Sequence, residues 1–259
     1  MTRSRAASIS LSVKNWSAYA PGVTDRAGWQ AWAKDDIAIS GPVEPDVKFV
    51  APMMRRRLSS LSRMAFRVAA DCLEDDTGSP TFVLCSRYGE YARSYGILEN
   101  IAAGNPPSAA AFSMSVHNTA NSLFSIETKN RSASTALAGG EATLETGFLE
   151  AWSLLINRTA SSVLLIYLDE RLPALYQAQK STVSHDGAIA MLLKLPDDAA
   201  GGIGLDLAWT KRESSTTIAC DAVADPAMQV LKLLVNGEGS FDLDAERLVW
   251  TWNARYGAT

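Results

Sequence analysis

The sequence predicts an α/β fold with a mixed sheet, and three observations support this prediction. Between residues 55 and 168, apolar strand-like runs alternate with segments of helical periodicity, which is typical of layered α/β domains. The run VLLIYL within 162–168 is apolar throughout, as expected for a central parallel strand. Segments 187–195 and 203–210 are separated by the turn PDDAAGG, so we expect a β-hairpin there and hence a mixed sheet.

The first hundred residues are expected to contain two strands and two long helices. Residues 9–18 read as a strand that ends at a Pro-Gly turn, and 55–75 repeats apolar residues at helical spacing. A short apolar strand at 81–86 precedes a helix at 87–103, which the sequence GNPP ends. Between these elements, the pattern indicates a short polar helix or loop with Trp29 and Trp32, then an extended connector over 41–52.

The pattern continues with one long helix over 108–128, followed by a strand at 132–136 and a helix at 140–157. The first of these helices is expected to turn Phe112, Val116, Leu123 and Phe124 inward. After the expected hairpin, a short helix at 225–235 and a strand at 247–252 complete the chain.

Length and composition favour one compact domain over residues 1–259, with 47% hydrophobic and 20% charged residues. A net charge of −4 argues against general nucleic-acid binding, which needs a basic face. No apolar run approaches the roughly 20 residues of a membrane helix. The beginning of the chain lacks the apolar core of a secretory signal, so the expected location is cytoplasmic.

Cysteine and histidine are scarce, which makes a metal site improbable. Cys72, Cys85 and Cys220 form no CxxC pair, and the only histidines are His117 and His185. Cys72 and Cys85 are expected to be buried free thiols.

The junction between the strand at 132–136 and the following helix is the main candidate for a catalytic position. Such a junction can hold a side chain near a helix N-terminus, where backbone N–H groups favour an anion, and enzymes place a nucleophile there. This sequence has Leu137, which has no lone pair, no ionisable proton and no affinity for metals. Gly139-Gly140 is too little for a phosphate loop. If the junction is an active-site elbow, it carries no reactive group.

Each of the next polar motifs has a structural explanation as well as a functional one. Arg55, Arg56 and Arg57 could receive a phosphate or an acidic protein, or form a solvated face. His117, within the stretch FSMSVHN, is either a hydrogen-bonded structural residue or a general base. Ser115 is not an obvious partner for it, because side chains two residues apart on a helix point apart.

Two further motifs are explained most simply without catalysis. His185-Asp186-Gly187 leads into an apolar strand and reads as a turn. Glu141, Glu145 and Glu150 are expected to form a solvated helix face.

Seven segments, taken in order, carry a resemblance to a known family. They are MMRRRLSSLSRMAFRVAADCL (53–73), TFVLCSRYGE (81–90), NPPSAAAFSMSVHNTANSLFSI (105–126), RSASTALAGGEATLETGFLEA (131–151), SSVLLIYLDE (161–170), SHDGAIAMLLKL (184–195) and GIGLDLAWTK (202–211). Together they resemble the amino-terminal half of β-ketoacyl synthases, the condensing enzymes of fatty-acid and polyketide assembly. The segment 105–126 is similar to a branch of half-length, stand-alone proteins with an FSxSVHN signature. The resemblance covers residues 8–213 and leaves 214–259 as an extension of unknown role.

The resemblance implies the N-terminal half of a thiolase-like fold, a mixed sheet with helices on both faces, but two departures separate this chain from an active synthase. The synthases carry a nucleophilic cysteine in an elbow of the type S-A-C-A, where this chain has Thr135-Ala136-Leu137-Ala138. Their two catalytic histidines lie in a second half, and neither His117 nor His185 matches them.

A subunit that keeps this shape without the chemistry is a chain-length factor, which the resemblance associates with aryl polyene biosynthesis. It implies a heterodimer with a full-length ketosynthase, an acyl carrier protein as further partner, and no cofactor except the carrier protein's phosphopantetheine. It also suggests an acyl tunnel lined by Phe112, Met114, Phe124 and Leu137, although the simpler interpretation of Phe112, Met114 and Phe124 is ordinary core. The implied partner interface comprises Arg131, Ser132, Ala133, Ser134, Thr135, Ala136, Ser115, His117 and Asn118, with possible carrier-protein contacts at Arg55, Arg56 and Arg57.

Two alternatives stay open at this point. One is a stand-alone acyltransferase or hydrolase that uses Ser115 with His117, or Cys85. The other is a self-associating scaffold without an active partner.

Overall fold

The structure is a computed structural model that describes most of the chain. The described residues are 7–41, 44–74, 78–176, 185–196, 201–212, 225–245 and 247–256. Cys220 and most of the predicted PDDAAGG turn lie outside them.

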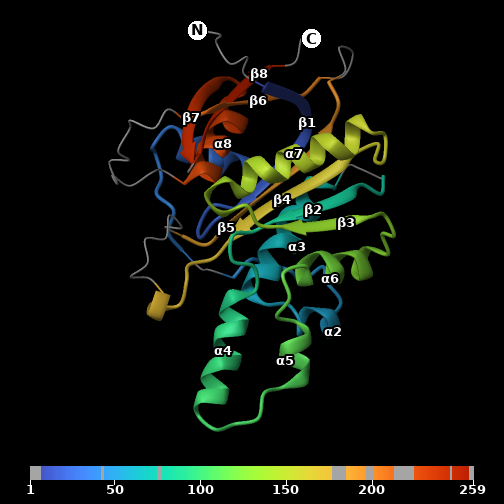
Figure 1. Cartoon of the computed structure of the whole chain (residues 1–259), viewed down its shortest axis with the longest axis vertical. Coiled ribbons are helices and arrows are strands. Elements are labelled where there is room, and N and C mark those ends of the chain that lie inside the picture. The colour runs from blue at the N-terminus through green and yellow to red at the C-terminus, as the bar shows by residue number, and fades with distance from the viewer. Residues whose placement is uncertain are drawn as a thin grey trace.

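Eight strands form one mixed sheet in the order β3-β2-β4-β5-β1-β6-β8-β7 (Figure 1). Strands β3, β2 and β4 are parallel to one another, and the remaining neighbours are antiparallel. The bounds are β1 Ala7–Tyr19, β2 Thr81–Cys85, β3 Ser134–Leu137, β4 Val163–Asp169, β5 Gly187–Lys194, β6 Ile203–Lys211, β7 Gly239–Ala245 and β8 Leu248–Tyr256.

The predicted mixed α/β fold is confirmed, but the predicted hairpin is wrong. Strands β5 and β6 do not pair with each other, because β1 lies between them and pairs with both. Sequence proximity favoured a local pairing, whereas β1, which is 13 residues long, uses both of its edges to join the two segments. Strand β7 was not predicted at all, and it pairs with β8 at the far edge of the sheet.

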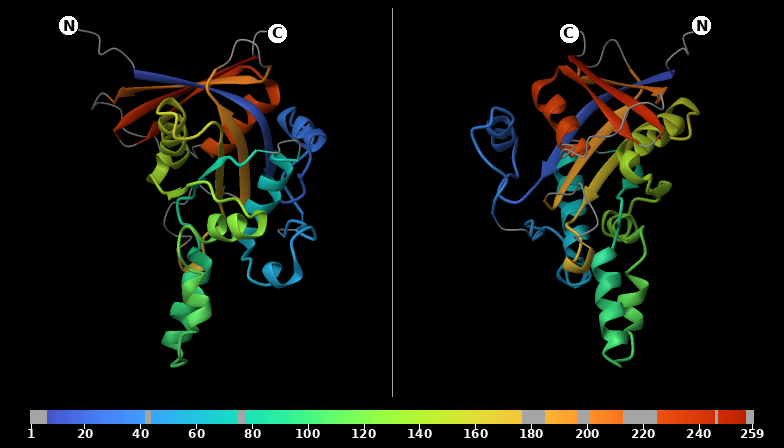
Figure 2. Two further views of the ribbon diagram at one scale, coloured as in Figure 1. Left: turned by 90° about the vertical axis from the view of Figure 1, so that its right-hand side faces the viewer. Right: turned by 60° about the vertical axis from the view of Figure 1, so that its left-hand side comes forward.

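Helices cover both faces of the sheet (Figures 1 and 2). On one face, α3 (Ser60–Cys72) and α6 (Thr119–Thr128) pack on alternate residues of the central strands. On the other face, α7 (Thr143–Ile156), α8 (Pro226–Asn236) and Trp29 of α1 (Arg26–Ala33) pack on the intervening strand residues. The alternation follows from the period of two along a strand, so both faces of the central strands must be apolar. In the described part of the chain, no helix combines the length and the apolar character that crossing a membrane requires.

The helix predicted over 108–128 is interrupted. It divides into α5 (Ala109–Ser113) and α6, and residues 114–118 between them are not helical. Leu123 and Phe124 are buried as predicted, but Phe112 and Val116 are exposed, so their predicted inward orientation is wrong. The apolar periodicity of 108–128 predicted one continuous helix. The structure instead has local hydrogen bonds in the interruption, such as that from Thr119 Oγ1 to the carbonyl of Met114 (3.0 Å).

The helix predicted over 55–75 begins later than expected. Ser59 caps α3 by accepting a hydrogen bond from the backbone N–H of Ser62 (3.0 Å), so the arginines at 55–57 precede this helix. Arg55 instead ends the short helix α2 (Pro52–Arg55).

Helix α4 (Tyr91–Ala102) and α5 project beyond the end of the sheet as a two-helix arm (Figure 1). We call residues 91–113 the α4–α5 arm. Neither helix contains a buried residue. The arm therefore contributes little to the core of its own chain.

Candidate functional site

The elbow lies where β3 ends and α7 begins. Leu137 is the last residue of β3, and a 3-10 turn over Gly140–Ala142 leads into α7. The hydroxyl of Thr143 accepts a hydrogen bond from the N–H of Gly139 (3.0 Å) and donates one to the carbonyl of Gly140 (2.7 Å). The Leu137 side chain is half-buried against the core beneath α7. An alkyl group can neither attack nor accept a proton, and the predicted tunnel-lining role of Leu137 stays a prediction.

Cys85 lies beside Leu137 across the β2–β3 pair but is sealed from solvent. A Cβ atom on Gly147 of α7 would lie 2.1 Å from the Cys85 sulfur, so the glycine allows the helix to pack directly on the thiol. Burial raises the pKa of Cys85 well above its ordinary value, which disfavours the thiolate. These properties argue against Cys85 as a nucleophile.

Ser115 and His117 lie in the break between α5 and α6, and their side chains face different partners. The Ser115 hydroxyl donates to the carbonyl of Phe112 (2.8 Å). Nε2 of His117 lies 2.9 Å from the carbonyl oxygen of Ser86, so Nε2 carries the proton in this hydrogen bond. Nδ1 keeps its lone pair, but the Ser115 hydroxyl is directed to the Phe112 carbonyl and not to the imidazole, which disfavours the hydrolase alternative.

A buried ion pair lies at the carboxyl ends of β2 and β4. Asp169 accepts hydrogen bonds from the Ser86 hydroxyl, from the backbone N–H and Nε of Arg87, and from the Tyr167 hydroxyl, each at 2.9 Å. The side chains of Arg87 and Asp169 are almost inaccessible to solvent. Removing one partner would leave a buried charge, which is strongly destabilising, so this pair rigidly holds the loop after β2.

Glu145 is the second buried acid, and its predicted place on a solvated face is wrong. Its side chain is 0% exposed, and one oxygen accepts a hydrogen bond from Nε1 of Trp252 in β8 (2.8 Å). Burial raises the pKa of Glu145 to about 7, against smaller opposing effects that include the Trp252 hydrogen bond. Trp252 also packs against Phe148, so β8 covers the first turns of α7. Glu141 is exposed, as predicted.

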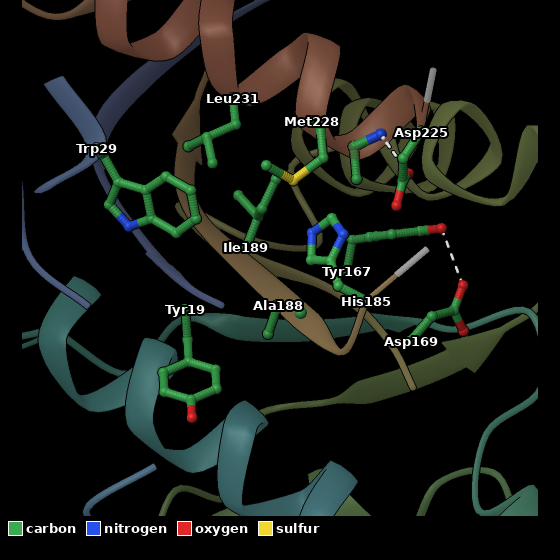
Figure 3. Close-up of a pocket in the computed structure, with 12 residues that line it drawn as sticks. Tyr19, Trp29, Tyr167, Asp169, His185, Ala188, Ile189, Asp225, Met228 and Leu231 are labelled. Carbon is green, nitrogen blue, oxygen red and sulfur yellow. Dashed lines mark hydrogen bonds between the residues drawn. The ribbon is translucent and has the colours of Figure 1, made fainter. Parts of the chain in front are cut away.

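A small pocket lies between α8 and the ends of β1, β4 and β5 (Figure 3). Trp29, Met228 and Leu231 form its apolar side, while His185, Asp169 and Asp225 supply polar groups. Burial lowers the pKa of His185 and raises the pKa of Asp225, which also caps α8 through the N–H of Ala227 (3.0 Å). Within the described residues, no group of three or more His, Cys, Asp or Glu side chains could hold a metal ion.

The structure separates the residues that were predicted to line a tunnel. Phe124 belongs to the core, where its ring contacts Phe66 and Phe82. Met114 is half-buried, whereas Phe112 is 68% exposed on the α4–α5 arm. A tunnel role for Phe112 and Met114 therefore requires a second molecule, and it stays a prediction.

The residues predicted at a partner interface lie mostly at the surface. Arg131, Ala133, Ser134 and Asn118 are exposed, and Ser132, Thr135, Ala136, Ser115 and His117 are half-buried. Arg56 and Arg57 are exposed and Arg55 is half-buried.

Comparison with known proteins identifies the family. The β-ketoacyl synthase N-terminal domain matches residues 29–253, and the chain therefore belongs to this family. The match includes most of the segment after residue 213, for which the sequence resemblance had no counterpart. No curated protein matches the sequence.

Among solved structures, the chain is similar to one in the complex of the ketosynthase ApeO with its chain length factor ApeC from Xenorhabdus doucetiae. The two are 30% identical with a TM-score of 0.78, and the alignment covers 95% of this chain and 99% of that chain. The matched chain is therefore about as long as this one. The ishigamide ketosynthase/chain length factor gives a TM-score of 0.73 at 14% identity, over 96% of this chain and 99% of that chain.

The fold also matches larger ketosynthases. A ketosynthase from module 1 of the bacillaene synthase of Bacillus amyloliquefaciens is 17% identical with a TM-score of 0.57. That alignment covers 80% of this chain but only 47% of the ketosynthase. The predicted resemblance to half-length β-ketoacyl synthase-like proteins is thus confirmed.

Sequence reasoning missed the buried polar groups. Asp169 ends the apolar strand VLLIYLD, a position from which an acid reaches the carboxyl edge of a parallel sheet, and this signal could have found it. Nothing local distinguishes Glu145 from its solvated neighbours, since its partner Trp252 is 107 residues away in the sequence.

Proposed function

We propose that this protein is a non-catalytic chain-length-factor subunit that pairs with an active ketosynthase and shapes the tunnel that receives the growing acyl chain. One observation carries the proposal: a β-ketoacyl synthase fold ends its elbow strand in Leu137 and aligns end to end with a chain of a ketosynthase–chain length factor complex. The partner would supply the cysteine and the histidines. This subunit would limit product length by steric exclusion.

The edge strand β3 supports pairing with another subunit. It is the outermost strand on its side of the sheet, and no strand in the described residues pairs with its outer edge. Its inner edge is fixed to β2 by bonds such as Phe82 N–H to the Ala133 carbonyl and Ser86 N–H to the Leu137 carbonyl, both 3.2 Å. Because peptide groups alternate along a strand, Ser134 and Ala136 direct their N–H and C=O groups outward. An open edge of this kind is available for pairing.

Exposed apolar residues near the same end of the molecule support a large interface. Leu98, Ile101, Phe112 and Val116 lie on or beside the α4–α5 arm and are all exposed. Apolar side chains gathered on one projecting element are typical of an interaction surface. In the proposed complex they would meet the ketosynthase, and Phe112 would be positioned to border the shared tunnel.

The proposal includes an acyl carrier protein that delivers substrates on its phosphopantetheine arm, in line with an aryl polyene or polyketide type of assembly. Carrier proteins are typically acidic, and Arg55, Arg56 and Arg57 offer a basic surface for one. No cofactor bound to this chain is needed.

The interface is tested by a matched pair of substitutions at Ser134. Ser134→Pro removes an outward N–H, which an edge strand tolerates, and should abolish co-purification with a full-length ketosynthase from the same genome. Ser134→Thr keeps the N–H and should co-purify like the wild type. If Ser134→Pro folds and still binds as tightly as the wild type, pairing through β3 is wrong.

The proposed lack of condensation activity is tested by a substitution at the elbow. Leu137→Cys should not condense acyl and malonyl carrier-protein thioesters by itself, because no histidine lies at the positions that the reaction requires. Condensation by that variant alone would mean that the elbow retains catalytic surroundings. Covalent acyl mass on Ser115 or Cys85 of the wild-type chain would favour an acyltransferase instead.

A further inference from the structure

Three parts of the molecule meet at Ser86, the residue that follows β2. Its N–H donates to the carbonyl of Leu137 at the elbow (3.2 Å), and its carbonyl accepts from His117 (2.9 Å). Its hydroxyl donates to Asp169 (2.9 Å) and accepts from the N–H of Gly89 (2.8 Å). Ser86 is buried, so these bonds are shielded from competing water.

We infer that His117 is a positioning residue that fastens the α5 end of the α4–α5 arm to the rigid end of β2, and so presents the arm in one orientation to the ketosynthase. The inference rests on the proposed function, which names the ketosynthase as the partner that meets the arm. It assigns His117 a role different from direct contact or catalysis. The residue acts through the loop at 114–118, which connects the arm to α6.

The packing around the imidazole supports this role. Gly89 has a positive φ of 56°, and a Cβ atom there would lie 2.6 Å from Cδ2 of His117. The ring therefore lies directly against the backbone of the loop after β2. A side chain held by one hydrogen bond and a close backbone contact has little freedom to rotate, which fixes the loop that carries it.

The α4 end of the arm has an anchor of its own. Glu90 immediately precedes α4, is buried, and accepts hydrogen bonds from the hydroxyls of Ser59 (2.7 Å) and Ser62 (2.8 Å) at the start of α3. Arg93 of α4 pairs with Glu90 and donates to the carbonyl of Arg57 (3.1 Å). The two ends of the arm are thus held at two different points, and His117 supplies the one on the α5 side.

The base of the His117 anchor is rigid because Asp169 holds both Ser86 and Arg87. Removing the imidazole should loosen the arm without disturbing this ion pair or the sheet. Neither helix of the arm has a buried residue, and the bonds of Arg93 hold only the α4 end, so the α5 end depends most on His117.

The test compares His117→Ala with His117→Gln, whose amide can still donate toward the Ser86 carbonyl. We expect amide hydrogen exchange across residues 109–118 of the free chain to rise about five- to tenfold in His117→Ala, the amount expected for one lost hydrogen bond. Affinity for the ketosynthase should fall by a similar factor. His117→Gln should restore most of both. Thr159→Ala, which removes a hydroxyl bond to the Leu154 carbonyl at the opposite end of the strands, is the matched control and should change neither.

Unchanged exchange and unchanged affinity in a folded His117→Ala would overturn the inference, as would a His117→Gln variant that behaves like the alanine. If His117→Ala does not fold, His117→Asn, whose amide is too short to reach Ser86, serves the same purpose. Failure of the wild-type chain to bind any ketosynthase would sink the proposed function alone, because the exchange measurement on the free chain still decides whether His117 holds the arm.

Discussion

Helices α3 and α4 have almost the same length, 13 and 12 residues, but opposite relations to the rest of the chain. Helix α3 buries eight side chains against the sheet, whereas α4 buries none. Both helices nevertheless carry apolar residues. Helix α3 is therefore held by the core of its own chain, while the apolar residues of α4 stay accessible for the contact with a ketosynthase that we propose.

The largest expected effect comes from removing one large apolar side chain from each helix. Phe66→Ala in α3 should lower the free energy of unfolding by about 3–5 kcal/mol, because the ring is 0% exposed and leaves a cavity. Leu98→Ala in α4 removes a side chain that is 57% exposed and should cost less than about 0.5 kcal/mol. Denaturant unfolding measures both. Equal losses would contradict the distinction between the two helices.

A second effect concerns the buried acid of α7 and depends on pH. The pKa of Glu145 rises from the ordinary value of 4.5 to about 7 in the folded protein, so between these values the folded state binds more protons than the unfolded state. The stability that Glu145 contributes is therefore present below about pH 4.5 and is lost as the pH rises through 7. Relative to Glu145→Gln, the wild type should lose up to about 3 kcal/mol over this range. Unfolding curves of both proteins at pH 5 and pH 8 test the sign, and a wild type that gains stability relative to the variant would refute it.

The smallest expected effect concerns glycine-to-alanine substitutions in α7 and α4, which should change the stability of the protein in opposite directions. Gly147→Ala should destabilise the protein by about 1–3 kcal/mol, because the new methyl group would meet the Cys85 sulfur. Gly96→Ala in α4 meets nothing within 4 Å and should stabilise by about 0.5–1 kcal/mol through helix propensity. Thermal unfolding of the two variants checks the comparison. Adding Cys85→Ala should recover part of the loss in Gly147→Ala only if the sulfur contact is its cause.

Local patterns were sufficient to predict much of the fold. The apolar run at 162–168, the helical spacing after residue 58 and the small residues at 132–136 correspond to β4, α3 and β3. Of these, β4 and α3 are strongly apolar and continuous, so periodicity alone finds them. The hairpin failed because strand pairing is a long-range property, and no local signal shows that β1 separates β5 from β6.

The candidate site was predictable only in part, for a related reason. The lack of a nucleophile at the elbow could be predicted from the sequence, because it depends only on the identity of residue 137. Glu145 with Trp252, and Ser86 with His117, depend on contacts between distant segments. The sequence also could not distinguish the buried helix α3 from the exposed α4, since both show apolar residues at helical spacing.

In the proposed complex, this chain pairs with a ketosynthase, forms part of the acyl tunnel and performs no condensation itself. The most direct measurement combines native mass spectrometry with a condensation assay on this chain, on a full-length ketosynthase from the same genome, and on their mixture. We predict a one-to-one complex in the mixture, no acyl mass on this chain, and products whose length depends on its presence. Acyl transfer to this chain, or two proteins that stay separate at micromolar concentration with unaltered products, would contradict the account.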